Sequence, residues 1–214
     1  MEFLDPKLDA YVHKMTSPEP DLLSALNRET YAKVIMPRML AGHLQGRVLS
    51  MLSYMIKPKY VLDVGTYTGY SAHCFAEGVQ DGGKVVSLDV NDELSWIHDQ
   101  YVKSSDYKDK IEIIFGKALE VIPSLDYDWN IVFLDADKEN YLNYYNLLIE
   151  KLKPGAYILA DNVLWSGKIL DEREVEKDEE TRALYNYSKT ITEDERVENV
   201  LFPIRDGLMV ARVK

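Results

Sequence analysis

The decisive stretch of the chain reads Asn130-Ile131-Val132-Phe133-Leu134-Asp135-Ala136-Asp137-Lys138-Glu139-Asn140-Tyr141. Its first part is apolar and rich in β-branched and aromatic residues, which is typical of a buried parallel strand. Two carboxylates and an amine follow directly, so charge stands at the carboxyl end of this strand. Ligands of open α/β sheets bind at that edge. The stretch therefore predicts a parallel sheet with a site at the carboxyl edge.

A second stretch has the same design, because the apolar run 156–160 leads directly into Asp161-Asn162. If the two strands are neighbours, their ends offer one shared set of polar groups to a single crevice. That set comprises Asp135, Asp137, Lys138, Asp161 and Asn162.

Strand and helix patterns alternate through the middle of the chain, which favours a doubly wound parallel sheet. The expected strands are 60–65, 84–89, 111–115, 130–134 and 156–160, with helices at about 72–76, 92–101, 118–122 and 141–152 between them. A helix to about residue 191 and two short apolar runs, 197–203 and 208–213, come last. The Asp206-Gly207 pair between these runs is a hairpin signal. We expect an α/β, Rossmann-like, mostly parallel seven-stranded sheet with an antiparallel C-terminal hairpin.

The first part of the chain is helical in pattern, with three apolar stripes between residues 6 and 56. We therefore predict one domain over 1–214, made of an N-terminal helical cap (1–57) and a Rossmann-like core (58–214). The charged segment 168–180 contains few apolar residues, and we expect it to be the most mobile part.

Composition restricts the partners. The net charge of −11 and a pI near 4.9 disfavour general binding to nucleic acid or to an anionic membrane surface. The single cysteine, Cys74, rules out an internal disulfide and suits a reducing cytoplasm. The N-terminus lacks the features of a signal peptide, and no apolar run reaches the ~20 residues of a membrane span. These observations predict a soluble, cytoplasmic protein.

The turn after the first strand contains Gly65 and Gly69, with three residues between them, one of which is the bulky Tyr67. This spacing fits a pyrophosphate poorly, since the dinucleotide fingerprint is G-x-G-x-x-G. The acid Asp63 also opposes an anion and suits a cation. Asp89 ends the next strand, in the usual position of an acid that binds ribose hydroxyls. A ligand with adenosine, no phosphate and a positive charge is S-adenosylmethionine.

Three blocks resemble the signature motifs of the cation-dependent caffeoyl-CoA and catechol O-methyltransferase family of class I S-adenosylmethionine-dependent methyltransferases. They are Val64-Gly65-Thr66-Tyr67-Thr68-Gly69-Tyr70-Ser71, Leu134-Asp135-Ala136-Asp137-Lys138-Glu139-Asn140-Tyr141 and Asp161-Asn162-Val163-Leu164-Trp165-Ser166-Gly167. The resemblance covers nearly the whole chain, including residues 39–46 and Asp206-Gly207-Leu208. It implies a homodimer and a phenolic small molecule as methyl acceptor.

The resemblance also implies a cofactor site. Asp63, Gly65 and Thr66 would hold the methionyl end with Ser71 and Asp137, Asp89 would bind the ribose, and Ala118 would lie beside the adenine. The full implied set is Met39, Ala41, Asp63, Gly65, Thr66, Tyr67, Ser71, Asp89, Ala118, Asp135 and Asp137. Family members often carry Glu at the position of Asp63, which keeps the charge. They often carry Thr or Ser at the position of Ala41, so a side-chain hydrogen bond is absent there.

Asp135, Asp161 and Asn162 offer only hard oxygen donors, which favours Mg²⁺ over zinc, with Mn²⁺ or Ca²⁺ also possible. A structural reading stays open, in which these residues cap a helix and begin a turn. Lys138 resembles the general base of the family. A metal-bound catechol hydroxyl would lose its proton to Lys138 and attack the sulfonium methyl.

The acceptor is less defined by the sequence. The loop with Trp165 and Ser166 and the N-terminal helices are expected to wall a pocket for a catechol-like or phenylpropanoid molecule. Methylation of a hydroxylated transfer RNA nucleoside is a second hypothesis, which the net charge disfavours. The same motifs would also suit a non-catalytic S-adenosylmethionine-binding protein, but the intact Asp135, Lys138, Asp161 and Asn162 disfavour that. An NAD-dependent oxidoreductase is disfavoured by the spacing of the two glycines.

Overall fold

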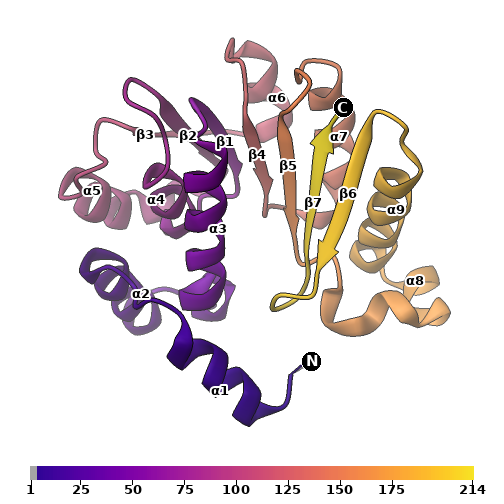
Figure 1. The fold of residues 1–214 in the computed structure, drawn as a ribbon, viewed down its shortest axis with the longest axis horizontal. Helices are drawn as coiled ribbons and strands as arrows, with labels where there is room; N and C mark the ends of the chain where they lie inside the picture. The colour runs from indigo at the N-terminus through magenta and orange to yellow at the C-terminus, as the bar shows by residue number, and fades with distance from the viewer. Residues whose placement is uncertain (1–3) are drawn as a thin grey trace. The chain divides into compact units, whose positions relative to one another are not determined.

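Helices and strands alternate along the chain as the sequence pattern predicts (Figure 1). The structure is a computed structural model and describes residues 4–214. Within that range, no helix is both long enough and apolar enough to cross a bilayer. The elements are α1 (Pro6–Met15), α2 (Asp21–Lys33), η1 (Pro37–Met39), α3 (Gly42–Ile56), β1 (Tyr60–Val64), α4 (Tyr70–Ala76), β2 (Lys84–Asp89), η2 (Asp92–Leu94), α5 (Ser95–Lys103), β3 (Ile111–Phe115), α6 (Ala118–Val121), η3 (Ile122–Ser124), β4 (Ile131–Leu134), η4 (Lys138–Asn140), α7 (Tyr141–Ile149), β5 (Tyr157–Asp161), η5 (Trp165–Leu170), α8 (Glu172–Lys177), α9 (Glu179–Glu193), β6 (Val197–Phe202) and β7 (Leu208–Val213).

The seven strands make a mostly parallel sheet with an antiparallel C-terminal part, which confirms the predicted fold class. Residues 4–117 and 118–214 form two compact units. The first unit holds the parallel strands β3-β2-β1, in that order. The second holds β4-β5-β7-β6, in which β4 and β5 are parallel and β7 is antiparallel to both of its neighbours.

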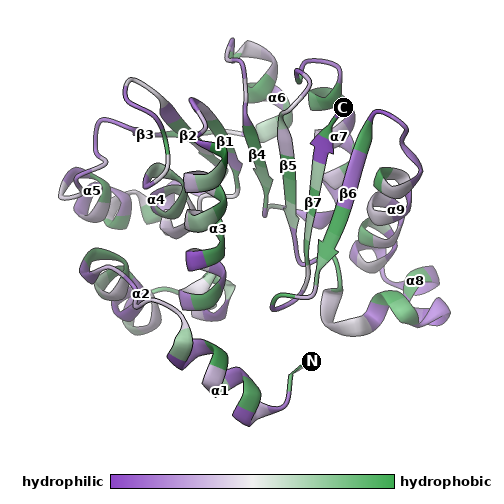
Figure 2. Ribbon diagram, viewed as in Figure 1, coloured by the Kyte–Doolittle hydropathy of each residue, from purple (hydrophilic) through white to green (hydrophobic). Residues whose placement is uncertain are grey.

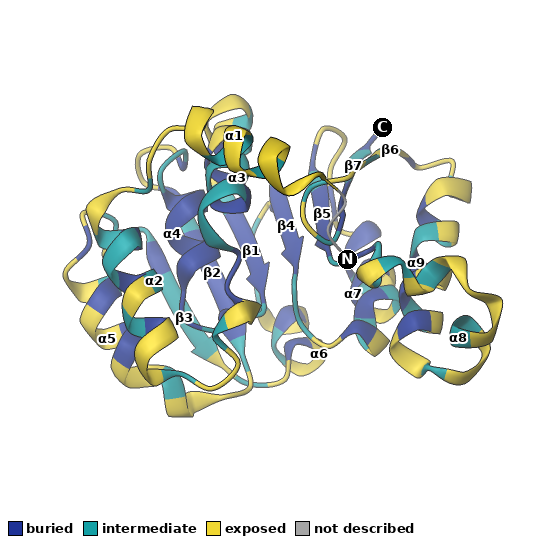
Figure 3. Cartoon of the chain, turned by 90° about the horizontal axis from the view of Figure 1, so that it is seen from below, coloured by how far each residue is buried: buried dark blue, intermediate teal, exposed yellow. Residues whose placement is uncertain are grey.

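The strands coincide with apolar runs of the sequence because side chains on both faces of each strand are buried. All four residues of β4 are buried, and so are the last four of β1 and of β5 (Figure 3). Figure 2 shows the same strands as hydrophobic. Such two-sided burial requires long apolar runs without alternation, and the runs end where Asp63, Asp135 and Asp161 appear.

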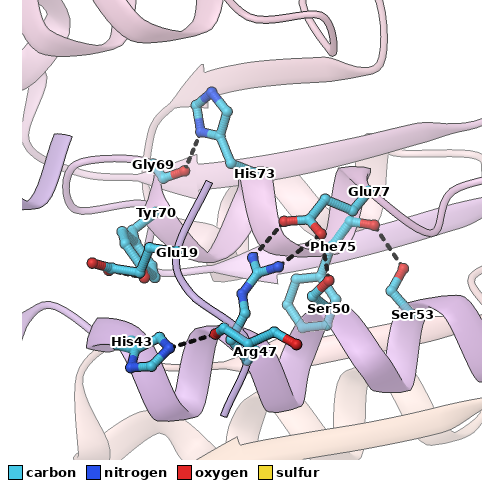
Figure 4. A network of polar contacts seen from close by, with 11 residues as sticks. Glu19, His43, Arg47, Ser50, Ser53, Gly69, Tyr70, His73, Phe75 and Glu77 are labelled. Atoms are coloured by element: carbon cyan, nitrogen blue, oxygen red, sulfur yellow. Dashed lines mark hydrogen bonds and ion pairs between the residues drawn. The ribbon is translucent and has the colours of Figure 1, made fainter. Parts of the chain in front are cut away.

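In the first unit, α3 packs closely on α4 through a partly buried polar network (Figure 4). The Arg47 guanidinium donates two hydrogen bonds to the Glu77 carboxylate, and the Ser50 hydroxyl donates a third at 2.6 Å. Gly78 permits the close approach, since a Cβ there would lie 2.3 Å from the carbonyl carbon of Ser53. Arg47 and Glu77 compensate each other's charge where both side chains are partly removed from water.

In the second unit, α9 packs against α7 and β6 and buries an aromatic cluster. The ring of Tyr187 meets the rings of Tyr141 and Tyr145 edge to face, at centroid distances of 5.5 and 6.3 Å. Edge-to-face contacts of this kind add to the free energy gained by burying the rings. The cluster therefore anchors the start of α7, directly after the charged end of β4.

The segment 168–180 contains α8, which the sequence analysis did not predict. The Asp171 carboxylate accepts a hydrogen bond from the backbone N–H of Arg173 at 2.9 Å and caps this helix. The single domain with a separate helical cap stays a prediction. The cap helices and β1 to β3 belong to the same compact unit.

Candidate active site

The turn between β1 and α4 is the predicted cofactor loop, and it has an unusual backbone. Gly65, Tyr67 and Gly69 all have positive φ values of 109, 49 and 85°. The backbone N–H groups of Gly65 and Thr66 both donate to the carbonyl of Leu88, at 2.9 and 3.1 Å. These bonds attach the loop to the carboxyl end of β2, the strand that is paired with β1.

Asp89, at the end of β2, holds the loop through its carboxylate. Oδ2 accepts the backbone N–H of Tyr67 at 2.7 Å, and Oδ1 accepts the backbone N–H of Asn91 at 2.9 Å. Each oxygen keeps a second lone pair. The Asp89 carboxylate is therefore oriented by backbone donors and can still accept hydrogen bonds from a ligand.

Asp63 lies near the end of β1 and is fully buried. Its Oδ2 accepts hydrogen bonds from the hydroxyls of Ser87 at 2.7 Å and Ser71 at 3.0 Å. Ser87 is also 2.6 Å from the hydroxyl of Thr66, so the predicted residues Asp63, Thr66 and Ser71 belong to one hydrogen-bonded group.

Met39 and Ala41 lie before α3, where Met39 is 56% exposed and Ala41 is buried. The Tyr67 hydroxyl lies 3.3 Å from the carbonyls of Ile35 and Met36, which connects the segment between α2 and α3 to the cofactor loop. A pocket of about 470 Å³ opens beside it, among α2, the start of α3 and the segment before α2. It is lined by Glu19, Ser24, Asn27, Arg28, Tyr31, Leu40, Gly42 and His43.

The ends of β4 and β5 lie side by side, which is the condition under which the sequence predicted one shared set of polar groups. Leu134 pairs with Ala160, so Asp135 and Asp161 follow at the same level of two neighbouring parallel strands. Lys138 is buried, and its Nζ donates to Asp135 Oδ1 at 3.0 Å and to the Tyr141 hydroxyl at 2.8 Å. The tyrosine hydroxyl lies 2.9 Å from the carbonyl of Leu134 and 3.2 Å from that of Asp161.

Two carboxylates repel each other at these strand ends. The pKa of Asp135 is raised to about 7, chiefly by burial and also by the nearby Asp161, while Lys138 and Arg205 oppose the shift. Asp161 is buried, whereas Asp135 is partly exposed, and Oδ1 of Asp161 accepts the backbone N–H of Asn162 at 2.8 Å. A cation bound by these carboxylate oxygens would reduce the repulsion between Asp135 and Asp161.

The predicted metal ligands fit a divalent cation by their donor chemistry. Asp135, Asp161 and Asn162 provide two carboxylates and one amide oxygen, the ligands that Mg²⁺ and Ca²⁺ prefer. Asn162 has a left-handed backbone, with φ at 62°. No group of three His, Cys, Asp or Glu side chains suited to a metal exists in the described range 4–214. A site there would therefore need the amide or other ligands.

Two further predicted cofactor residues belong to the second unit. Asp137 is exposed and accepts hydrogen bonds from the Tyr144 hydroxyl at 2.6 Å and from the Asn140 amide. Ala118 is buried at the first position of α6. Tyr144 on α7 and Asn140 just before it therefore fix the orientation of Asp137.

The loop with Trp165 and Ser166 is held by the turn of the C-terminal hairpin. Both residues are left-handed, with φ values of 44 and 53°. The backbone N–H of Ser166 donates to Asp206 Oδ1, and that of Leu164 donates to the Asp206 carbonyl at 2.8 Å. A Cβ at Gly207 would lie 2.5 Å from Leu164, so only glycine fits there.

The roles of Tyr141 and Tyr144 were not predicted from the sequence. Tyr141 is the last residue of the motif 134–141 and follows Lys138 by three residues. Tyr144 follows Tyr141 by three more. This spacing, i to i+3, brings side chains to one face of a helix. The spacing could have indicated that the tyrosine hydroxyls of α7 form hydrogen bonds with Lys138 and Asp137, which lie just before this helix.

Residues 13–214 match the family model described as O-methyltransferase. A caffeoyl-CoA O-methyltransferase of Nicotiana tabacum is 31% identical over 204 residues, which are 91% of this chain and 85% of the relative. A caffeoyl-CoA O-methyltransferase of Eucalyptus globulus is 32% identical over 203 residues, which are 91% of this chain and 82% of the relative.

Solved structures show the same similarity. A methyltransferase of Podospora anserina bound to S-adenosylhomocysteine has a TM-score of 0.88 at 26% identity and covers 97% of this chain and 94% of its own. An O-methyltransferase of Bacillus cereus in complex with S-adenosylhomocysteine has a TM-score of 0.88 at 25% identity and covers 97% of each chain.

We predict that Tyr141→Phe lowers the free energy of unfolding by about 1–2 kcal/mol, because Lys138 and the strand-end carbonyls lose a buried partner. Urea denaturation measures the change. Tyr185→Phe is the matched control, since Tyr185 is exposed on α9, and we expect a change within about 0.5 kcal/mol there. Equal stabilities of Tyr141→Phe and the wild type would contradict the role assigned to the hydroxyl.

Proposed function

Because the chain belongs to the O-methyltransferase family, whose model matches residues 13–214, we propose that it methylates a hydroxyl of a catechol-like or phenylpropanoid small molecule with the help of a divalent cation. The family model, the relatives and the solved structures identify the chain as an S-adenosylmethionine-dependent O-methyltransferase. The observation that supports the proposed acceptor and cation is the pair of carboxylates at neighbouring strand ends, the partly buried Asp135 and the buried Asp161, beside Lys138.

S-adenosylmethionine is proposed to bind at the carboxyl ends of β1 and β2. Asp89 would accept the ribose hydroxyls, because its two oxygens are already oriented by backbone N–H groups. Asp63, with Ser71 and Thr66, would face the cationic methionyl end. Met39, Ala41, Gly65 and Tyr67 would contact the cofactor, and Ala118 and Asp137 are proposed contacts from the second unit.

Asp135, Asp161 and Asn162 would hold the divalent cation, most simply Mg²⁺. A bound cation supplies Lewis acidity that lowers the pKa of an acceptor hydroxyl. Two vicinal hydroxyls of a catechol suit such a site, since both can bind one ion. The donors are all oxygen atoms, which disfavours zinc.

Lys138 is proposed to take the acceptor's proton at Nζ. The bonds to Asp135 and Tyr141 fix the amine at the end of β4. S-adenosylmethionine would supply the methyl group to the deprotonated acceptor oxygen, and S-adenosylhomocysteine would leave with the electron pair of the broken carbon–sulfur bond. Holding the two reactants in line supplies much of the rate enhancement.

Trp165 and Ser166 are proposed to wall the acceptor site. Their loop is fixed by Asp206 and Gly207, so it offers a preformed surface and not a flexible one.

The net charge of −11 supports a small acceptor over a nucleic acid. The one cysteine, Cys74, is a buried free thiol, which supports a reducing cytoplasm as the place of action.

The central test is methyl transfer from labelled S-adenosylmethionine to catechol, caffeic acid and undermodified transfer RNA, with Mg²⁺ or with chelator. We expect transfer to the catechols only, and a loss of about 100-fold or more with chelator, because the cation stabilises developing charge by several kcal/mol. Transfer that survives chelation would exclude the cation. Transfer to transfer RNA alone would exclude the proposed acceptor class.

Lys138→Met should lower kcat by about 10²–10⁴ while S-adenosylmethionine affinity stays within about threefold, because a general base contributes to the chemical step and not to cofactor binding. Steady-state kinetics and calorimetric titration measure the two quantities. Lys151→Met is the matched control, since Lys151 is exposed. A variant with full turnover would remove Lys138 from the mechanism.

We also propose that two copies of the chain form a homodimer. Exposed apolar side chains lie on α1, namely Leu8, Tyr11 and Met15, and on the last two turns of α3, namely Met51, Tyr54 and Met55. Apolar surface of this kind marks association sites. Light scattering should give twice the mass of one chain, and Met51→Glu with Met55→Glu should give the mass of one chain. A wild-type protein with the single-chain mass at micromolar concentration would contradict the homodimer.

A further inference from the structure

Tyr67 adopts a backbone conformation that its side chain disfavours. Its φ of 49° lies in the left-handed region, where the Cβ of an L-residue approaches the next carbonyl too closely. Glycine flanks it at positions 65 and 69, yet the middle of the loop is a bulky aromatic residue. A residue of this type keeps such a conformation only when the surroundings hold it.

Two side chains hold the peptide groups on either side of Tyr67. Its N–H donates to Asp89 Oδ2 at 2.7 Å, and its carbonyl lies 2.7 Å from His98 Nε2. A carbonyl oxygen only accepts, so Nε2 carries the hydrogen and donates. Asp89 and His98 therefore fix the Tyr67 backbone from opposite ends.

His98 is itself rigidly placed. It lies on α5, is 5% exposed, and stacks on the ring of Phe115 at a centroid distance of 5.8 Å and an angle of 25°. Burial lowers the pKa of His98, against the opposing effects of the Tyr67 carbonyl, Asp89 and Asp99. The imidazole is therefore neutral at neutral pH, with its one hydrogen on the nitrogen that faces Tyr67.

We infer that His98 is a positioning residue for cofactor binding, which orients the ribose-binding carboxylate of Asp89 through the Tyr67 peptide. Without the donor on the carbonyl side, Tyr67 can relax to negative φ, and its N–H then leaves Asp89. The inference rests on the proposed role of Asp89 at the ribose. It assigns a function to a residue outside the three family motifs.

His73 does not share this role, although it also contacts the loop. Its Nδ1 lies 2.7 Å from the carbonyl of Gly69, the residue four positions earlier that precedes helix α4. A contact of this kind is local to the first turn of that helix. His98 instead comes 31 residues after Tyr67 and joins the loop to α5.

The test compares His98→Gln with His98→Met. The two replacements have nearly the same length and volume, but only the glutamine amide can donate where Nε2 does. We expect His98→Met to weaken binding of S-adenosylhomocysteine by about tenfold, and His98→Gln by less than about threefold. In steady-state assays the KM for S-adenosylmethionine should rise by the same factors, while kcat falls by less than about twofold.

A second background separates positioning from packing. Tyr67→Gly needs no support at positive φ, so His98→Met should cost less than about threefold in that background. His98→Leu serves as a second donor-free variant if His98→Met does not fold. The control is His13→Met on α1, which should leave cofactor affinity unchanged.

The outcomes distinguish this inference from the proposed function. If Asp89→Ala leaves the affinity for S-adenosylhomocysteine unchanged, the proposed cofactor site is wrong. If Asp89→Ala weakens binding but His98→Met and His98→Leu do not, only the role of His98 is wrong. Equal losses in His98→Gln and His98→Met, or an undiminished loss in the Tyr67→Gly background, would also overturn the role of His98.

Discussion

A carboxylate that is wholly or partly removed from water needs hydrogen bonds or a cation, and Asp63, Asp135 and Asp161 are such carboxylates at or next to the ends of buried strands. Asp63 receives the hydroxyls of Ser71 and Ser87. Asp135 receives a hydrogen bond from Nζ of Lys138. Asp161 receives the backbone N–H of the next residue. The local structure after each strand follows from this requirement, because each partner must be brought to a fixed position.

The partners are brought there by different means. Ser71 is in the first turn of α4, and Lys138 begins the short helix before α7. Lys138 in turn depends on Tyr141, whose ring is held edge to face against Tyr187 of α9. Apolar packing in the second unit therefore determines where the buried Lys138 side chain lies. A position defined by packing is stiff, which is what a group that reacts with a substrate requires.

Four of the seven non-glycine residues with positive φ in residues 4–214 lie in two of the loops that follow these strands. Tyr67 is left-handed in the loop after β1, and Asn162, Trp165 and Ser166 are left-handed after β5. Each lies in a motif that the sequence analysis connected with cofactor, metal or acceptor. Strained residues persist only where several contacts hold them, and the contacts of Asp89, His98 and Asp206 with the backbone of these two loops are of that kind.

The sequence by itself determined the strands, the Gly65 and Gly69 turn, the hairpin at Asp206-Gly207 and the charged residues at the strand ends. These features depend on local patterns, since apolar runs form buried strands and glycine permits positive φ. The sequence could not predict α8 from its charge-rich segment. Only the tertiary structure decided which partners the charges meet: Ser87 lies 24 residues from Asp63, and His98 lies 31 from Tyr67. Such pairs form because packing brings distant elements together, and no local pattern records which elements will meet.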